Sequence, residues 1–136
     1  MKPPVESIRL TNSEKELLVR AKRKTSIDSW NVLCRWALLL GLSDNSIRIQ
    51  RNPEKRDSVE IKWDTFAGKW SDAFSAAIYL QHQRQLADSP NTTVFEFFHA
   101  KLEGGIRQLT KLTNDKGLNA FDSLTGWPDP QKVDVT

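Results

Sequence analysis

Clustered cations are the chemical groups that stand out first in this sequence of 136 residues. Four of the five residues from Arg20 to Lys24 are Lys or Arg. Residues 1–62 carry 13 Lys and Arg against 8 Asp and Glu, whereas residues 63–136 carry 7 against 9. A basic segment of this kind is typical of proteins that bind a polyanion. The simpler alternative is the solvated face of a helix.

The phosphate groups of a nucleic acid are ligands that suit such cations. We expect sequence-independent phosphate contacts from five side chains: Lys15, Arg20, Lys22, Arg23 and Lys24. Arg35 could contact phosphate or form an ion pair at an interface, and the sequence leaves both open.

Residues for catalysis or metal binding form no recognisable set. Cys34 is the single cysteine, and His82 and His99 fall in no metal-ligand spacing. Cys34 lies among apolar residues, where a thiol is usually inert. The chain has no glycine-rich phosphate loop. We therefore predict a protein that is not an enzyme and that needs no cofactor or metal.

The cysteine count and the apolar runs bear on the cellular compartment. A single thiol cannot form an intramolecular disulfide and suits a reducing environment. The longest apolar stretch, Trp36 to Leu42, is far shorter than the ~20 residues of a membrane-spanning helix. The first residues show no signal-peptide apolar region. We expect a cytoplasmic protein.

The elements that must position the cations begin with a strand. Residues 5–11 alternate between apolar and polar side chains, as in a half-buried strand. A helix is expected from Glu14 to Lys24, with Ser13 and Glu16 as its capping box. Its cations surround an apolar stripe, so this helix must both pack and bind.

A second helix is expected from Ile27 to Leu42, and it is apolar nearly all round. One small core cannot bury such a helix completely, which favours an oligomer. We expect its interface residues to be Trp30, Leu33, Trp36 and Leu40.

The rest of the chain predicts a short hairpin and two further helices. Residues 46–50 and 59–63 alternate around a polar loop, as in an antiparallel hairpin. Helices should run from Trp70 to about Leu86 and from Thr92 or Thr93 onward. Gly104-Gly105 interrupts the last helix and implies a kink, a helix end or a close approach by another backbone.

These elements predict an α+β fold that is predominantly α-helical. The order is a short N-terminal strand followed by two helices (ribbon-helix-helix-like), a short hairpin and two further helices. Residues 1–113 should form a single compact domain for DNA binding and oligomerisation. Residues 114–136 should form a flexible or loosely docked tail, which Trp127 could anchor.

A strand followed by two helices suggests a second way of binding DNA. Dimers that pair such strands insert a two-stranded ribbon into the major groove. Ser7, Arg9 and Thr11 would then face the bases. Any exposed strand face also carries polar residues at alternate positions, so we favour the phosphate contacts.

One segment resembles a known family. Residues 24–37, KTSIDSWNVLCRWA, resemble the most distinctive stretch of the DndE family, and the run WNVLCRWA carries the specificity. Residues 63–68, WDTFAG, and a block around His99 and Gly105 are similar to later family blocks. The resemblance covers about residues 5–110. Gly104 stands where the family usually has a basic residue, so no role is carried over to that position.

The resemblance implies a setting that composition and spacing do not show. DndE proteins are encoded with bacterial DNA phosphorothioation systems, which replace a non-bridging phosphate oxygen with sulfur. A member would be a DNA-binding accessory subunit, a homotetramer with lysine-rich DNA-facing surfaces and a preference for nicked duplex. Implied partners are a cysteine desulfurase, an iron–sulfur sulfurtransferase-like protein and an ATPase-like subunit, with no membrane partner.

Two other functions remain open. One is a metal-dependent DNA nickase that uses scattered acids such as Asp64, Asp72 and Glu96. The other is a structural assembly hub without DNA affinity, which would hold protein partners on the apolar surface of the second helix.

Overall fold

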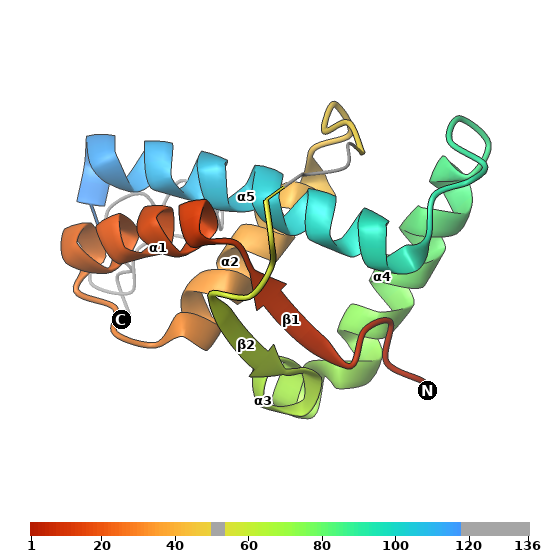
Figure 1. Cartoon of the computed structure of the whole chain (residues 1–136), viewed down its shortest axis with the longest axis horizontal. Coiled ribbons are helices and arrows are strands. Elements are labelled where there is room, and N and C mark those ends of the chain that lie inside the picture. Colours follow the sequence, from red (N-terminus) through yellow and green to blue (C-terminus); the bar gives the residue numbers. More distant parts are fainter. Residues whose placement is uncertain (50–53, 118–136) are drawn as a thin grey trace, which may run out of the picture.

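The computed structural model describes residues 1–49 and 54–117. The elements follow the chain in the order β1 (Ser7–Leu10), α1 (Asn12–Thr25), α2 (Trp30–Ser43), β2 (Val59–Lys62), α3 (Trp63–Ala67), η1 (Gly68–Trp70), α4 (Ser71–Gln85) and α5 (Val94–Lys116). Helices predominate, and β1 and β2 form a short antiparallel sheet (Figure 1). The predicted α+β class, with an N-terminal strand followed by two helices, is confirmed.

Helix α1 is capped by a different residue from the one predicted. Thr11 is the N-cap, not Ser13: its hydroxyl accepts from the Glu14 N–H at 3.1 Å, and the Glu14 carboxylate accepts from the Thr11 N–H at 2.9 Å. Both candidate boxes have suitable spacing, but the Thr11 box is buried against the rest of the fold, whereas Ser13 is exposed. Helix α1 ends before Ser26, whose left-handed backbone lets its N–H reach the carbonyl of Lys22.

Strand β2 pairs with β1, and the predicted hairpin partner is wrong. Ile8 lies opposite Ile61 and Leu10 lies opposite Val59. Residues 46–49, expected to pair with residues 59–63, lie outside any strand. The reason is cross-strand packing, because this register brings apolar side chains of both strands together, and Ile8 and Leu10 become fully buried.

This pairing within one chain corrects the ribbon interpretation for Ser7 and Thr11. Both residues are buried, and of the three expected to face bases, Arg9 alone is exposed. The other edge of β1 is also engaged, since the Arg9 N–H donates to Nε2 of His99 on α5 at 3.3 Å. The strand therefore does not present Ser7, Arg9 and Thr11 together on an accessible face.

Glycines set the separation of α2 and α5, which cross at the centre of the molecule (Figure 1). A Cβ on Gly105 would lie 1.6 Å from the carbonyl oxygen of Ala37, and one on Gly41 would lie 1.9 Å from that of Lys101. The backbones can approach this closely because glycine has no side chain. Of the three meanings predicted for the glycine pair, the close approach is confirmed. Helix α5 continues through the pair to Lys116.

Helix α1 lies beside α5, and both run towards the same end of the molecule (Figure 1). The Thr110 hydroxyl of α5 contacts the carbonyl of Leu17 on α1 at 3.4 Å. The two-stranded sheet and α3 lie on the other side of α2 from the α5 C-terminus, and α4 packs against the N-terminal part of α5. The C-terminal halves of α1 and α5 thus share one face of the protein.

Helix α4 has nearly the predicted bounds, since it was expected from Trp70 to about Leu86 and spans Ser71–Gln85. Helix α5 was expected to begin at Thr92 or Thr93, and its N-cap is Thr93, in a capping box with Glu96. The expected domain end at 113 falls inside α5, and residues 118–136, with Trp127, lie outside the described residues. Within the described ranges, no helix has both the length and the apolarity to cross a membrane.

Candidate nucleic-acid interface

The predicted cations of α1 reach solvent. Lys15, Arg20, Arg23 and Lys24 are exposed, and Lys22 is half-buried. None of the five has an ion-pair partner within 4.0 Å among the residues that the structure describes. Cations in the last turn also stabilise a helix through its dipole, which is the structural explanation for part of this set. The dipole acts only within that turn, so it accounts for neither Lys15 nor Arg20.

The buried face of α1 determines where these side chains point. Leu18, Ala21 and Thr25 lie at helical spacing and are inaccessible to solvent. Lys22, at one side of this stripe, places its ammonium 4.6 Å from the ring centroid of Trp30 at the start of α2. A cation–π contact of this kind is worth roughly 0.5–1 kcal/mol at an exposed site. Lys22 therefore joins the packing of α1 on α2 and still presents positive charge.

An internal ion pair removes one of the two acids of α1 from the surface. The Glu14 carboxylate is buried and lies 2.7 Å from Nη1 of Arg56, whose Nη2 lies 3.7 Å from the Glu103 carboxylate. Burial raises the pKa of Glu14, and the backbone hydrogen bond from Thr11 and the Arg56 charge oppose that rise. Glu14 therefore does little to offset the exposed cations of α1.

Helix α5 adds cations that sequence reasoning missed. Arg107 and Lys111 are exposed, and Arg107 lies one turn before Thr110, the residue that contacts α1. Arg107 pairs with Glu103 at 2.9 Å. The i, i+4 spacing of Glu103 and Arg107 was visible in the sequence. The position of the α5 cations relative to α1 could not be predicted, because it depends on how the two helices pack. We define the basic surface as Lys15, Arg20, Lys22, Arg23, Lys24, Arg107 and Lys111.

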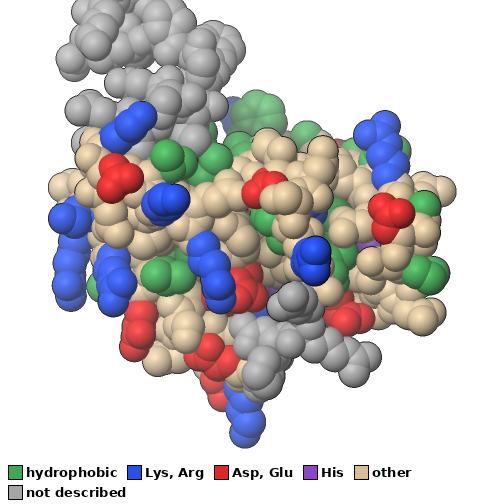
Figure 2. Space-filling model, turned by 90° about the horizontal axis from the view of Figure 1, so that it is seen from above, with side chains coloured by type: hydrophobic (Ala, Val, Ile, Leu, Met, Phe, Trp, Pro, Cys, Tyr) green, Lys and Arg blue, Asp and Glu red, His purple; other side chains and the backbone are tan. Residues whose placement is uncertain are grey.

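Figure 2 shows how charge is distributed on the face where α1 and α5 lie together. Lys and Arg side chains gather towards the end where both helices terminate, whereas Asp and Glu side chains are spread along the molecule. Helix α1 carries five Lys and Arg against two Glu, and one of these, Glu14, is buried. This end of the molecule is suited to contact a polyanion.

Arg9 and Arg35 lie apart from the other predicted cations. Arg9 is exposed on β1 and lies 3.9 Å from the Glu60 carboxylate across the sheet. Arg35 is half-buried, and its Nε donates to the carbonyl of Phe66 on α3. In the structure Arg35 therefore links α2 to α3.

The predicted interface residues of α2 do not all reach the surface. Trp30, Trp36 and Leu40 are half-buried, but Leu33 is fully buried in the core of its own chain. Leu39, which sequence reasoning did not select, is exposed. The apolar excess predicted for α2 is thus partly absorbed by α5 and partly left on the surface.

The candidate catalytic groups are not brought together. Burial raises the pKa of Cys34 to about 12, so this thiol stays protonated at neutral pH. Glu96 belongs to the α5 capping box, and Asp72 lies 3.6 Å from the N-terminal ammonium. In residues 1–49 and 54–117, no three His, Cys, Asp or Glu side chains form a group that could hold a metal ion.

Comparison with known proteins identifies a family. Residues 7–116 match the model of the family described as DndE, DNA sulphur modification protein DndE. No curated protein and no solved structure matches the chain. The match spans β1 to the end of α5 and includes the whole basic surface.

Proposed function

Because the chain belongs to the DndE family of DNA sulphur modification proteins, we propose that it is a DNA-binding accessory subunit of a DNA phosphorothioation system. The basic surface would contact the phosphates of duplex DNA without reading base sequence. The observation that carries this proposal is the cluster Arg20 to Lys24, which has no ion-pair partner among the described residues.

The proposal includes the finer features that the resemblance implies. The DNA would be duplex, nicked duplex in particular, and the partners would be the cysteine desulfurase, the iron–sulfur sulfurtransferase-like protein and the ATPase-like subunit of a cytoplasmic system. These partners would carry the sulfur chemistry, because the described residues offer neither a reactive thiol nor a metal site. The protein itself would bind the DNA and position it for these partners.

An oligomer would strengthen such binding. Helix α2 keeps Leu39 exposed, and Trp36 and Leu40 are half-buried beside the core. We propose that a second copy covers this face and that the assembly is a homotetramer. Several basic surfaces on one particle would then bind one duplex with a higher effective concentration.

Salt dependence of DNA binding tests the proposal directly. Titration of a labelled 30-base-pair duplex, followed by fluorescence anisotropy, should give log K that falls by about 0.9 per neutralised phosphate against log salt. The triple variant Lys22→Gln, Arg23→Gln, Lys24→Gln should bind more weakly and should lower this slope by up to about 3. Parallel titrations of intact, nicked and single-stranded DNA test the preferred form.

A matched triple variant separates a specific surface from net charge. Arg48, Lys62 and Lys69 are exposed and lie outside α1 and α5. Their replacement by Gln removes the same three charges and should leave affinity much closer to that of the wild type. Equal losses in the two triples would contradict the proposed surface. No binding at low salt would contradict the proposed function.

A further inference from the structure

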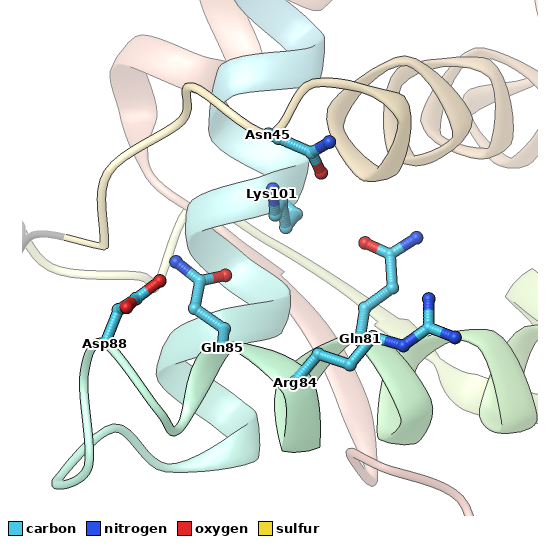
Figure 3. A pocket seen from close by; sticks show the side chains of 6 residues that line it. All are labelled: Asn45, Gln81, Arg84, Gln85, Asp88 and Lys101. Atoms are coloured by element: carbon cyan, nitrogen blue, oxygen red, sulfur yellow. The ribbon is translucent and has the colours of Figure 1, made fainter.

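A polar hollow of about 290 Å³ lies where α4, α5 and the segment after α2 meet (Figure 3). Its lining side chains are Asn45, Gln81, Arg84, Gln85, Asp88 and Lys101. All are polar or charged: two cations, one carboxylate and three carboxamides. The hollow lies near the first half of α5, away from the basic surface.

Lys101 is the unusual member of this lining. The residue is only 2% exposed, although lysine is almost never fully buried without a partner. Its ammonium donates one hydrogen bond, at 2.8 Å, to the backbone carbonyl of Asp44. An ammonium carries three N–H donors, so two remain without an acceptor among the described residues. Burial lowers the pKa of Lys101, and the Asp44 charge opposes that shift.

The backbone of Lys101 is held firmly. Gly41 of α2 packs directly against its carbonyl group, where a Cβ would meet the oxygen at 1.9 Å. The ring of Phe97 lies 5.7 Å from the ammonium, one turn earlier on α5. Lys101 is therefore anchored at its backbone and flanked on its side chain, so its ammonium is fixed at the hollow.

The opposite wall supplies groups that complement a negatively charged ligand. Gln81 and Gln85 lie one turn apart on α4, and Figure 3 shows both across the hollow from Lys101 and Asn45. The Asn and Gln amides offer N–H donors, and Arg84 adds a guanidinium. Asp88 is the single acid of the lining, and the carboxylate of Asp44 also acts on Lys101. The N–H donors of Lys101, Arg84 and the three carboxamides, and not a net charge, therefore favour an anion.

We propose that this hollow binds a phosphate-class oxyanion, with Lys101 as its central contact. Arg84 supplies a second positive charge, and the carboxamides of Asn45, Gln81 and Gln85 donate to the remaining oxygens. A water occupies about 30 Å³ of liquid volume, so the hollow has room for phosphate with several waters or for a phosphate carried by a larger molecule. The source is either free phosphate or a phosphate of DNA.

Isothermal titration of the full chain with inorganic phosphate tests this site. The wild type should show saturable binding at constant ionic strength. Lys101→Met keeps the length of the side chain but removes the ammonium, and it should weaken binding at least about tenfold. Lys69→Met removes an exposed lysine that lies outside both the basic surface and the hollow, and it should bind phosphate as the wild type does.

A purely structural role for Lys101, holding the end of α2 through Asp44, predicts a different result. Lys101→Met would then change thermal stability and leave phosphate affinity unaltered, which would overturn the proposal. Absence of saturable binding by the wild type would also overturn it. If Lys101→Met does not fold, as judged by circular dichroism, Arg84→Gln decides, because this exposed residue can change without loss of packing. It should weaken binding several-fold, and unchanged binding would overturn the site.

Competition distinguishes the two sources of phosphate. If the hollow takes a DNA phosphate, saturating phosphate should weaken duplex binding more than chloride of the same ionic strength does. Equal effects of the two salts would assign the site to a free anion. The phosphate site can be tested independently of the proposed function. If the protein binds phosphate but not DNA, the DNA-binding role is contradicted and the phosphate site is retained.

Discussion

Buried ionisable side chains in this protein hold protonation states set by their surroundings. The thiol of Cys34 and the carboxyl of Glu14 both have raised pKa values because burial disfavours their charged forms. The ammonium of Lys101 has a lowered pKa for the same reason. Of these groups, Lys101 lines a hollow, whereas Cys34 lies in the core. Lys101 can therefore contact a ligand in the hollow, whereas Cys34 serves only in packing.

His99 is held in the neutral form by two hydrogen bonds of opposite kind. Its Nε2 accepts from the Arg9 N–H at 3.3 Å and must therefore be unprotonated. Its Nδ1 lies 3.0 Å from the Phe95 carbonyl and must then carry the proton that it donates. Burial lowers the pKa of His99 from 6.5 to about 4, and the nearby Arg56 charge adds to this effect.

Folding stability should consequently fall with acid in a defined window. The unfolded chain protonates His99 near pH 6.5, whereas the folded chain does so only near pH 4. The stability that neutral His99 contributes is therefore complete above about pH 6.5 and is lost as pH falls towards 4, by up to about 3 kcal/mol. Urea denaturation of the wild type and His99→Gln at several pH values measures this loss.

The comparison with His99→Gln is needed to isolate the contribution of His99, because the titration of Glu14 changes the free energy of unfolding in the opposite direction. A raised carboxyl pKa in the folded state favours folding at low pH, whereas the lowered pKa values of Asp44 and Glu54 favour folding at higher pH, so the total pH dependence combines several groups. The difference between wild type and His99→Gln should narrow between pH 6.5 and 4. Profiles that stay parallel through this window would contradict the role assigned to His99.

At the scale of elements, the crossing of α2 and α5 depends on the absence of particular side chains. Gly105→Ala would place a methyl group 1.6 Å from the Ala37 carbonyl oxygen. Since this neighbour is backbone and cannot rotate away, the helices must separate. We expect a loss of about 3 kcal/mol or more in the free energy of unfolding, measured by urea denaturation.

The adjacent glycine provides the control. A Cβ on Gly104 would lie 2.5 Å from Cδ1 of Ile47, the end of a side chain that can change rotamer. Alanine is also about 1 kcal/mol more favourable than glycine inside a helix. Gly104→Ala should therefore stay within about 1 kcal/mol of the wild type. Similar losses for the two variants would contradict a specific requirement for Gly105 at the crossing.

Elements also show where sequence patterns were ambiguous. Thr11–Glu14 and Ser13–Glu16 both have capping-box spacing, and the buried contact of Glu14 with Arg56 distinguishes the first pair. Residues 46–50 and 59–63 both alternate, yet β2 pairs with β1, which lies almost fifty residues earlier in the chain. Local periodicity predicts a strand but does not identify its partner, because the partner is chosen by shared burial.

At the scale of the whole molecule, surface charge and surface apolarity lie in different places. The basic surface runs along α1 and the C-terminal half of α5, with most of its cations towards the end where both helices terminate, and the polar hollow lies towards α4. The exposed Leu39 belongs to α2, on the element that packs most extensively against α5. An oligomer formed through α2 could therefore leave the basic surfaces of its subunits accessible to DNA.

Analytical ultracentrifugation tests this oligomer. Leu39 is 46% exposed, and Leu39→Glu places a charge in the proposed contact, so we expect it to reduce the particle to a smaller species. Leu80 on α4 has a similar exposure of 51%, and Leu80→Glu should leave the assembly intact. A wild-type chain that remains monomeric over a wide concentration range would contradict the oligomer itself.

The sequence by itself determined the four longer helices, the N-terminal strand, the basic character of α1 and the family, whereas the short helix α3 was not predicted. These features are local, because hydrophobic periodicity, capping residues and a distinctive run of residues are all read within a short window of chain. Both bounds of α4 and the start of α5 were predicted closely for this reason.

The tertiary structure alone determined which residues distant in the chain become neighbours. Packing places α5, which carries Arg107 and Lys111, beside α1, buries Leu33 in the core and turns Arg35 towards α3. Packing also brings Lys101 to face α4 side chains that are distant in the chain. The cations of α1 thus form a surface with those of α5, and the hollow forms beside α4, through contacts between segments that are far apart in the chain and therefore leave no local signal in the sequence.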